Sequence, residues 1–335
     1  MNRFVAYNMP KIDLHCHLDG SMSPAVTGRL LKELGEEYGP KELEALLSAP
    51  ADCGSLAEYL ERFDLPIRCL QTKEGLKAAA FDLASAAASE HVVYLEVRFA
   101  PSFSVSRGLS VEEVIDSVES GLFAAREQTG IRTGIIVCGM RHLDMETNLA
   151  MLAAARELYG CGVVACDMAG DERAFPNAGY GEFFAAAKRL GMPFTIHAGE
   201  CGSRESIRDA VAFGASRIGH GIAMGGDKEL IRMCAEQKIG VEMCPTSNLQ
   251  TKAVGDFSCY PFTEFYEAGV PLSVNTDNRT VSGTCSTDEF MRLSDNGMMN
   301  ERISERIFRE SVEMSFADPD TKHRLMTEYN NLFVI

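Results

Sequence analysis

The segment KIDLHCHLDG, residues 11–20, carries two histidines one residue apart, His15 and His17. Alternate side chains of an extended strand point to the same side, so both imidazoles would share a face with Asp13 and Asp19. This geometry permits metal chelation. An isolated His-x-His pair is, however, more often a surface or core feature than a pair of ligands, so these ten residues leave both interpretations open.

Further polar residues follow other short apolar runs of the chain. They are Gly170, Asp171 and Glu172 in DMAGDE, His197 and Glu200 in HAGE, His220 in RIGHG, and Asp277 and Asn278 in NTDN. Imidazole and carboxylate groups suit Zn²⁺, and three histidines with one aspartate make a plausible set of ligands. A water as fifth ligand would make the site catalytic, which leaves His220 and Glu200 as the groups that could move protons.

These residues need a fold that delivers them to one place. Short β-rich runs recur at residues 11–15, 92–100, 133–140, 162–170, 193–199, 217–221, 239–244 and 271–277. The segments between them carry helix signals, such as the capping box formed by Ser110 and Glu113. This alternation indicates parallel βα units, and eight of them favour a TIM-type (β/α)8 barrel over a doubly wound sheet. Active sites of such barrels lie at the carboxyl ends of the strands, where the polar residues would converge.

Two regions depart from this alternation. The stretch between the first two runs is far longer than a βα loop needs, and it contains residues 56–70. Apolar residues recur there at helical spacing: Leu56, Tyr59, Leu60 and Phe63. We expect an added helix that packs on the barrel or forms a lid over its mouth. Further helices should follow the last strand, most clearly over 301–316, and no linker divides residues 1–335, which predicts a single domain.

The composition excludes several classes of function. The formal net charge is −16, and so negative a surface repels phosphate backbones and anionic membranes, so we expect no nucleic-acid or membrane partner. No apolar run is long enough to span a bilayer, and the first residues show no export signal, which predicts a cytoplasmic protein. The eleven cysteines include no C-x-x-C pair, so we expect reduced thiols.

An ordered set of short motifs resembles the adenosine deaminase family, a branch of the amidohydrolase superfamily. The motifs are KIDLHCHLDGS, YLEVRFAP, MRH, DMAGDE, HAGE, RIGHG, CPTSN and VNTD. Each is a weak signal by itself, but the ordered set covers nearly the whole chain and is specific. The resemblance implies a zinc-dependent TIM barrel of purine salvage. It would hydrolyse the 6-amino group of adenosine, and of 2′-deoxyadenosine, to give inosine-type products and ammonia.

The resemblance also implies roles at the reacting end of the site. One zinc ion per chain would be held by four ligands: His15, His17, His197 and Asp277. The proton-donating glutamate of the family corresponds to Glu200, and its catalytic histidine to His220. Asp277 could in addition accept a proton and pass it toward the departing ammonia.

The remaining implied roles concern substrate binding. Asp19, with His17 nearby, would meet the ribose 5′-hydroxyl, and the backbone N–H of Gly170 would meet the purine N3. Where many family members have a second aspartate after the zinc-binding one, this chain has Asn278. An asparagine amide donates a hydrogen bond at any pH, so we expect Asn278 to keep the contact with the purine N7.

Other substrates and classes of function remain open at this stage. A phosphorylated substrate is disfavoured by Asp19 and by the acidic composition, and free adenine would leave Asp19 without a ribose. A 5′-modified adenosine such as aminodeoxyfutalosine stays possible. A two-metal hydrolase of phosphotriesters, lactams or hydantoins often uses a carboxylated lysine on the fourth strand, where GVVACDMAG offers none. A binding protein without activity would release no ammonia from adenosine.

Overall fold

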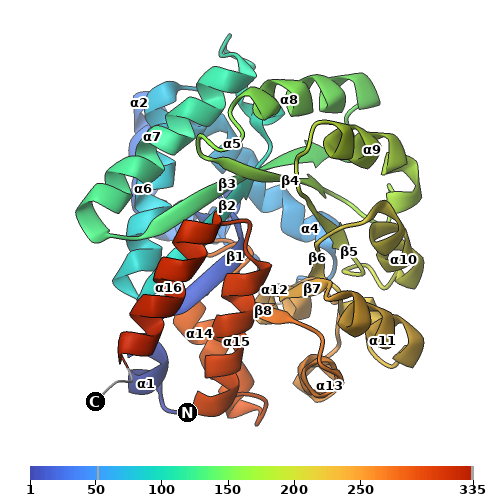
Figure 1. The fold of residues 1–335 in the computed structure, drawn as a ribbon. Coiled ribbons are helices and arrows are strands. Elements are labelled where there is room, and N and C mark those ends of the chain that lie inside the picture. The colour runs from blue at the N-terminus through green and yellow to red at the C-terminus, as the bar shows by residue number, and fades with distance from the viewer. Residues whose placement is uncertain (51–52, 333–335) are drawn as a thin grey trace.

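A computed structural model describes residues 1–50 and 53–332 of the chain. Within these residues eight strands form the centre of the molecule (Figure 1). The strands are β1 (Lys11–His17), β2 (Val92–Phe99), β3 (Arg132–Met140), β4 (Val163–Ala169), β5 (Thr195–Ala198), β6 (Arg217–His220), β7 (Gly240–Met243) and β8 (Leu272–Val274). Each strand coincides with one of the runs predicted from the sequence.

Hydrogen bonds close the strands into a parallel barrel. The strands pair in chain order within two four-stranded sheets, β1 to β4 and β5 to β8. Bridges between Cys16 and Asp277 and between Cys166 and Phe194 join the two sheets at both edges. All strands run in the same direction, so their carboxyl ends lie on one rim. The prediction of a TIM-type barrel rather than a doubly wound sheet is confirmed.

Helices surround the barrel, with at least one after each strand (Figure 1). They are α1 (Arg3–Asn8), α2 (Pro24–Glu33), α3 (Pro40–Leu47), α4 (Leu56–Leu60), α5 (Asp64–Cys69), α6 (Lys73–Ser89), α7 (Val111–Thr129), α8 (Met145–Glu157), α9 (Gly181–Arg189), α10 (Arg204–Phe213), α11 (Lys228–Gln237), α12 (Pro245–Gln250), α13 (Phe262–Ala268), α14 (Ser286–Asp295), α15 (Glu301–Met314) and α16 (Pro319–Leu332). None of them, over the residues described, is long and apolar enough to cross a membrane.

Helix α7 illustrates how local sequence sets these elements. The predicted capping box is present, with Ser110 accepting from the Glu113 N–H and Glu113 accepting from the Ser110 N–H. The helix ends at Gly130, whose φ of 80° suits a residue without a β-carbon. Its buried face includes Ile115 and Leu122, and burial of each such side chain contributes about 1.5–3 kcal/mol. The capping residues and the apolar face of the helix therefore predict the same element.

The two added helical regions lie where the sequence predicted them. Helices α2 to α6 separate β1 from β2, and α14 to α16 follow β8. Figure 1 shows α15 and α16, in red, beside β1. The buried residues of α15 include Ile307, Phe308 and Val312. All eleven cysteines are free thiols, as expected.

Candidate active site

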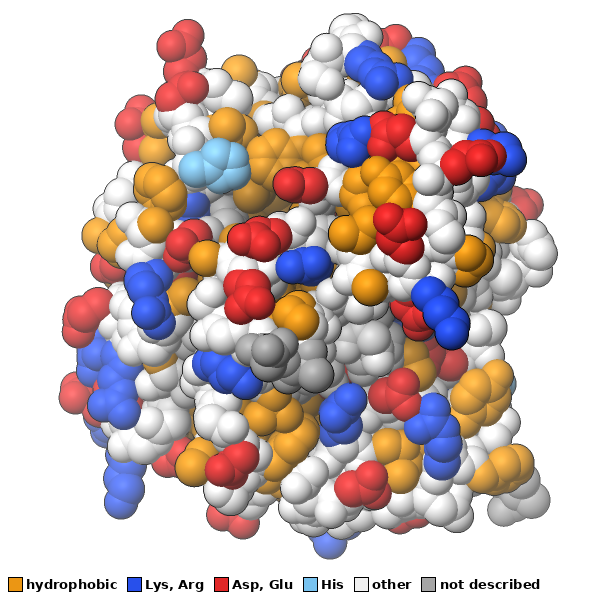
Figure 2. Space-filling view, turned by 180° about the vertical axis from the view of Figure 1, so that it is seen from behind, with side chains coloured by type: hydrophobic (Ala, Val, Ile, Leu, Met, Phe, Trp, Pro, Cys, Tyr) orange, Lys and Arg blue, Asp and Glu red, His pale blue; other side chains and the backbone are white. Residues whose placement is uncertain are grey.

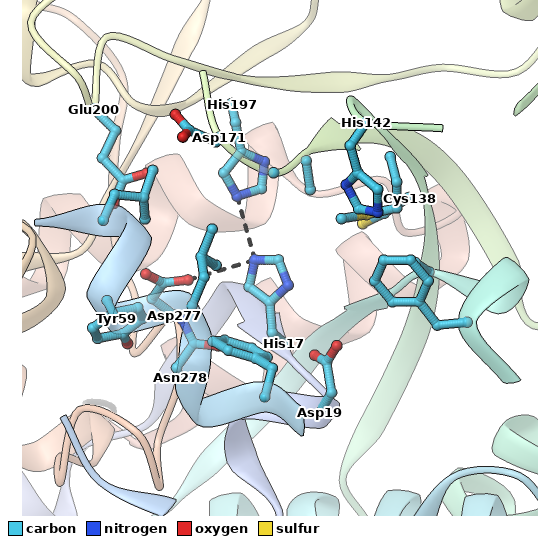
Figure 3. Close-up of a pocket in the computed structure, with 18 of the residues that line it drawn as sticks. His17, Asp19, Tyr59, Cys138, His142, Asp171, His197, Glu200, Asp277 and Asn278 are labelled. Carbon is cyan, nitrogen blue, oxygen red and sulfur yellow. Dashed lines mark hydrogen bonds and ion pairs between the residues drawn. The ribbon is translucent and has the colours of Figure 1, made fainter. Parts of the chain in front are cut away.

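A cavity of about 270 Å³ lies at the carboxyl ends of the strands. Its lining includes eight of the residues selected from the sequence: His17, Asp19, Gly170, His197, Glu200, His220, Asp277 and Asn278. His15, the ninth, is fully buried, and its Nε2 lies 3.3 Å from Asp277 Oδ1. Figure 3 shows His17, His197 and Asp277 grouped on one side of the cavity, with Asp19 near His17. The fold thus brings together the nine residues to which a role was assigned, and Asp171 also lines the cavity, whereas Glu172 lies outside the lining.

Four side chains form a cluster suited to a metal ion, which we call the histidine–aspartate cluster: His15, His17, His197 and Asp277. Asp277 Oδ1 lies 3.3 Å from His15 Nε2 and 3.5 Å from His17 Nε2. His17 Nε2 lies 3.3 Å from His197 Nε2. Ligand atoms bonded to zinc at about 2.0–2.1 Å with tetrahedral angles are about 3.3–3.4 Å apart. The spacing of these atoms therefore fits the first coordination shell of such an ion.

Buried carboxylates fix two of these imidazoles from behind. Glu242 Oε2 lies 2.8 Å from His15 Nδ1, and Asp167 Oδ2 lies 2.8 Å from His197 Nδ1. The guanidinium of Arg98 bridges the two carboxylates, at 2.9 Å from Asp167 Oδ2 and 2.8 Å from Glu242 Oε2. Such partners set the ring orientation and leave Nε2 as the ligand atom. Within residues 1–50 and 53–332, buried His15 Nε2 makes no hydrogen bond, as expected of an atom reserved for a ligand.

The protonation states of His17, His197 and Asp277 also fit a metal. Burial lowers the pKa of His17 and His197, which favours the neutral imidazole that binds metal ions. Burial opposes ionisation of Asp277, but the contact with His15 outweighs it and keeps the pKa of Asp277 well below its usual value. Burial and Arg98 likewise oppose protonation of His15, but Asp277 and Glu242 together raise its pKa.

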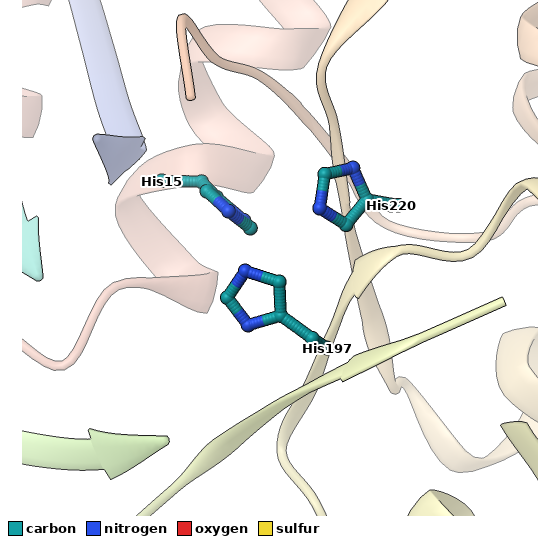
Figure 4. A group of neighbouring side chains, drawn as sticks. All are labelled: His15, His197 and His220. Atoms are coloured by element: carbon teal, nitrogen blue, oxygen red, sulfur yellow. The ribbon is translucent and has the colours of Figure 1, made fainter. Parts of the chain in front are cut away.

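His220 lies close enough to the cluster to be considered as a ligand. Its ring forms a compact group with His15 and His197, as Figure 4 shows. His220 Nδ1 is 2.9 Å from Asn248 Nδ2, so the amide N–H donates to it, and His220 Nε2 is 3.7 Å from Glu200 Oε2. Burial holds the pKa of His220 well below its usual value, so the ring is neutral. In this tautomer Nε2 carries the hydrogen and faces Glu200, so His220 can donate a hydrogen bond to a water in the cavity, while its Nδ1 lone pair is taken by Asn248.

Glu200 is a buried carboxyl that faces the same cavity, with 7% of the residue exposed. Burial, and then the negative charge of Asp277, raise its pKa to about 8. A glutamate that follows a strand could instead be an ordinary carboxylate in the first turn of the next helix, stabilised there by the helix dipole. Helix α10 begins only at Arg204 with Ser203 as its N-cap, so the first-turn dipole does not explain this carboxyl.

Two residues of the site have a left-handed backbone. The φ angles of His220 and Asp277 are 64° and 58°. For residues other than glycine this region costs of order 1–3 kcal/mol and is found preferentially at functional sites. The strain turns both side chains out of the regular strand direction at the ends of β6 and β8.

The other side of the cavity carries the residues selected for substrate binding. Asp19 is almost fully buried, and burial raises its pKa to about 6. Asn278 packs over Gly20, where a β-carbon would come within 1.9 Å of Asn278 Oδ1. That oxygen has no hydrogen-bond partner among the described residues, so the amide is free to meet a ligand. Gly170 follows β4 with a φ of 108°.

The sequence matches the family model for adenosine deaminase over residues 10–331. The chain belongs to the adenosine deaminase family. The adenosine deaminase of Enterococcus faecalis is 41% identical over 329 residues, which cover 97% of each chain. An Arabidopsis deaminase structure complexed with IMP has a TM-score of 0.87 at 26% identity and covers 97% of both chains. An amidohydrolase of Burkholderia ambifaria with bound Zn has a TM-score of 0.88 at 19% identity, covering 99% and 92%, and so shares the fold.

Helices α4 and α5, which we call the roof segment, cover the cavity of this family member. Cavity-lining side chains of the segment include Leu56, Leu60, Phe63 and Ile67. Tyr59 is buried against Cys53 and Val281, and its hydroxyl lies 2.6 Å from Ser282 Oγ, four residues after Asn278. The segment therefore packs on the barrel, as expected, and forms part of the cavity wall, while its role as a lid stays a prediction.

His142 follows the third strand in the motif MRH, where it could either reach the mouth of the barrel or, as the sequence favours, hydrogen-bond locally. In the structure His142 lines the cavity and stacks on Phe103, with ring centroids 5.6 Å apart and planes at 26°. Figure 3 shows it across the cavity from Glu200. The stack forms because the loops after β2 and β3 are neighbours on the rim.

The surface around the site is consistent with a small ligand. Figure 2 shows a recess lined by hydrophobic side chains, with acidic side chains nearby on the same face. A recess of this kind encloses an apolar ring, while the net charge of −16 gives long polyanions no favourable approach.

Sequence reasoning missed the charged residues inside the barrel. Glu96, Arg98, Asp167, Arg217 and Glu242 are all fully buried. Arg217 Nε lies 2.6 Å from Glu242 Oε1, and Arg217 Nη2 lies 2.6 Å from Glu96 Oε2, which extends the ion-pair network behind the cluster. A signal was present, because Glu96 and Arg98 alternate within an apolar run and so share the face that points into the barrel.

Proposed function

We propose that this chain hydrolyses adenosine to inosine and ammonia, with one zinc ion held by the histidine–aspartate cluster. Membership of the adenosine deaminase family supports the reaction. The observation that carries the site assignment is the separation of 3.3–3.5 Å between the ligand atoms of the cluster, beside a buried carboxyl in the same cavity. Carboxylate and imidazole donors are the ligands that zinc prefers in catalytic sites.

The reaction sets two chemical requirements. Carbon 6 of the purine resists attack by water, so the nucleophile must be activated and the ring must accept electrons. Zinc in such a site supplies hydroxide at neutral pH by lowering the pKa of water to about 7. The ring accepts electrons more readily when its N1 atom gains a proton as the nucleophile adds.

Glu200 is the residue that we assign to proton donation at N1. Its pKa of about 8 keeps the carboxyl protonated at neutral pH, because burial disfavours the charged form. His220, neutral and within 3.7 Å of Glu200, would orient the attacking water through its Nε2–H and stabilise charge on the attacking oxygen. Asp277 would accept one proton of the water at its carboxylate and pass it to the 6-amino nitrogen, which departs as ammonia, and the other proton of the water restores the Glu200 carboxyl. Each group begins in the protonation state that its step requires.

The opposite end of the cavity suits a ribose and the five-membered ring of the purine. Asp19 and His17 lie together there and would accept and donate hydrogen bonds at the 5′-hydroxyl. Asn278 would donate its amide N–H to N7, and the Gly170 N–H would meet N3. A 5′-phosphate would instead place negative charge beside Asp19, so we assign a nucleoside and not a nucleotide as substrate.

A substrate panel tests this function directly. Adenosine, 2′-deoxyadenosine, adenine, AMP and a 5′-substituted adenosine are compared by the loss of ultraviolet absorbance at equal concentration. We expect the highest kcat/KM with adenosine or 2′-deoxyadenosine, loss of turnover after chelation, and recovery when zinc is restored. Preference for AMP or adenine would contradict the assignment of Asp19.

The variant Glu200→Gln tests the proton donor within the same assay. The amide keeps the size of the side chain but has no acidic proton, so kcat should fall by about 10²–10⁴-fold. The metal content should stay at one ion per chain, because Glu200 is not among the proposed ligands. Near-normal turnover by this variant would remove the acid role from Glu200.

A further inference from the structure

Glu172 is a buried acidic residue that the proposed chemistry leaves without a role. It lies in the loop after β4, and only 3% of the residue is exposed. The backbone N–H of Gly199 donates to Glu172 Oε1 at 2.7 Å, and the N–H of Cys201 donates to Glu172 Oε2 at 3.0 Å. The two oxygens of a single carboxylate therefore hold the peptide groups on either side of Glu200.

The loop that carries Glu200 has a second constraint next to this one. Gly199 has a φ of 77°, and a β-carbon there would lie 2.5 Å from Ile207 Cδ1 of helix α10. The loop is thus pressed against α10 on one side and bonded to Glu172 on the other. Hydrogen bonds from N–H groups to a carboxylate are about twice as strong as those between neutral groups, so the two bonds from Glu172 are a large part of this constraint.

The Glu200 side chain has little support of its own among the described residues. Thr251 Oγ1, which partly offsets the raised pKa of Glu200, donates to the Ser247 carbonyl at 3.0 Å, and His220 Nε2 is 3.7 Å from Glu200 Oε2. Its position therefore depends mainly on the backbone on which it is mounted. A misplacement of about 1 Å at a reacting group can cost about 10²-fold in rate.

We propose that Glu172 is the positioning residue for Glu200, because its carboxylate holds the Gly199 and Cys201 peptide groups that flank the proton donor. The inference rests on the proposed function for the role of Glu200. Glu172 is not part of the cavity lining and touches no proposed metal ligand by its side chain. It also connects two site loops, since Gly170 lies two residues before it.

The first test compares Glu172→Gln and Glu172→Ala with a control at another buried carboxylate. Glutamine offers one acceptor oxygen, and its NH₂ group opposes the second N–H, while alanine removes both acceptors. The control is Glu289→Gln, because Glu289 is equally buried and accepts the Thr246 N–H from another segment, at 3.0 Å, but lies outside the cavity lining. Melting temperature, metal content, kcat and KM are measured for each variant.

We expect kcat to fall by about 10- to 100-fold in Glu172→Gln and further in Glu172→Ala, with KM within threefold and one metal ion per chain. Glu289→Gln should lower the melting temperature at least as much while keeping kcat within twofold. Values of kcat within twofold of wild type in both Glu172 variants would overturn the inference. A loss of kcat of equal size in Glu289→Gln would overturn it as well, because it would indicate a general effect of stability.

A double-mutant cycle separates positioning from any independent effect. If Glu172 acts through Glu200, Glu172→Gln should change kcat by less than twofold in a chain that already carries Glu200→Gln. A further 10-fold loss in that background would overturn the inference. Failure of the proposed function is distinguishable, since wild-type protein would then release no ammonia from adenosine and no kcat would exist to compare.

Discussion

The histidine–aspartate cluster and the roof segment face the same cavity but are held by different interactions. Behind the cluster, fully buried ion pairs connect the ligands to the barrel interior, as in the bridge of Arg98 between Asp167 and Glu242. The roof segment contributes apolar side chains and makes a buried polar contact through Tyr59 and Ser282. Removing one partner of a buried ion pair is far more costly than removing a neutral hydrogen bond. Substitutions behind the cluster should therefore cost more than substitutions in the roof segment.

Of the variants proposed for the two regions, His197→Ala in the histidine–aspartate cluster should have the largest effect. The change removes one proposed ligand, so we expect loss of both stoichiometric zinc and measurable turnover. The matched control is His323→Ala, in which the exposed histidine of α16 is removed. Metal analysis of the purified proteins checks the result, and full zinc content in His197→Ala would show that the cluster is not the binding site.

A smaller effect is expected one shell further from the metal, in Asp167→Asn. Asp167 holds His197 Nδ1 at 2.8 Å but does not itself reach the ligand atoms. Loss of such a partner typically weakens metal affinity by about 10–100-fold. Competition with a coloured chelator measures the affinity, with Glu289→Gln as control. Unchanged affinity would mean that the carboxylate supports the barrel and not the ligand.

The pH dependence of kcat/KM tests the electrostatics of the same region. Burial raises the pKa of Glu200 to about 8, and the proposed step needs the protonated form. Activity should therefore hold below this pH and fall as the pH rises through it, by about tenfold per unit. Glu200→Gln has no proton to lose, so its residual activity should lack this alkaline limb. If activity fell with rising pH in the same way in both proteins, a group other than Glu200 would be responsible for the fall.

The smallest effect is expected in the roof segment, from Tyr59→Phe. The ring stays packed against Cys53 and Val281, and the bond to Ser282 is lost. We expect a loss of about 1 kcal/mol in the free energy of unfolding. KM for adenosine should rise a few-fold at nearly constant kcat, since closure of the cavity changes but the reacting groups do not. A fall in kcat alone would place Tyr59 with the chemical groups.

Much of the fold was predictable because its signals are local. Each barrel strand is a short apolar run between helix signals, as with Val163–Ala169, and parallel strands place their carboxyl ends on one rim. The residues of the site could be selected for the same reason, since His197, His220 and Asp277 all end or follow a strand. Their chemical roles came from family resemblance and stay predictions.

Other features depend on contacts between segments far apart in the chain. The partnership of Arg98 with Asp167 and Glu242 joins three strands, and no spacing along the chain indicates which charges will meet. The stack of His142 on Phe103 likewise depends on how two loops pack. Glu172 was visible in DMAGDE, but its hydrogen bonds to the loop after β5 appear only in three dimensions.

The left-handed backbone of His220 has a consequence for protein engineering. Glycine adopts that conformation freely, whereas other residues carry a cost of about 1–2 kcal/mol there. A screen for heat resistance alone would thus favour glycine at this position and discard an imidazole beside the reacting centre. Directed evolution of a more heat-stable enzyme should measure product formation in every round, because stability and activity place opposite demands on this residue.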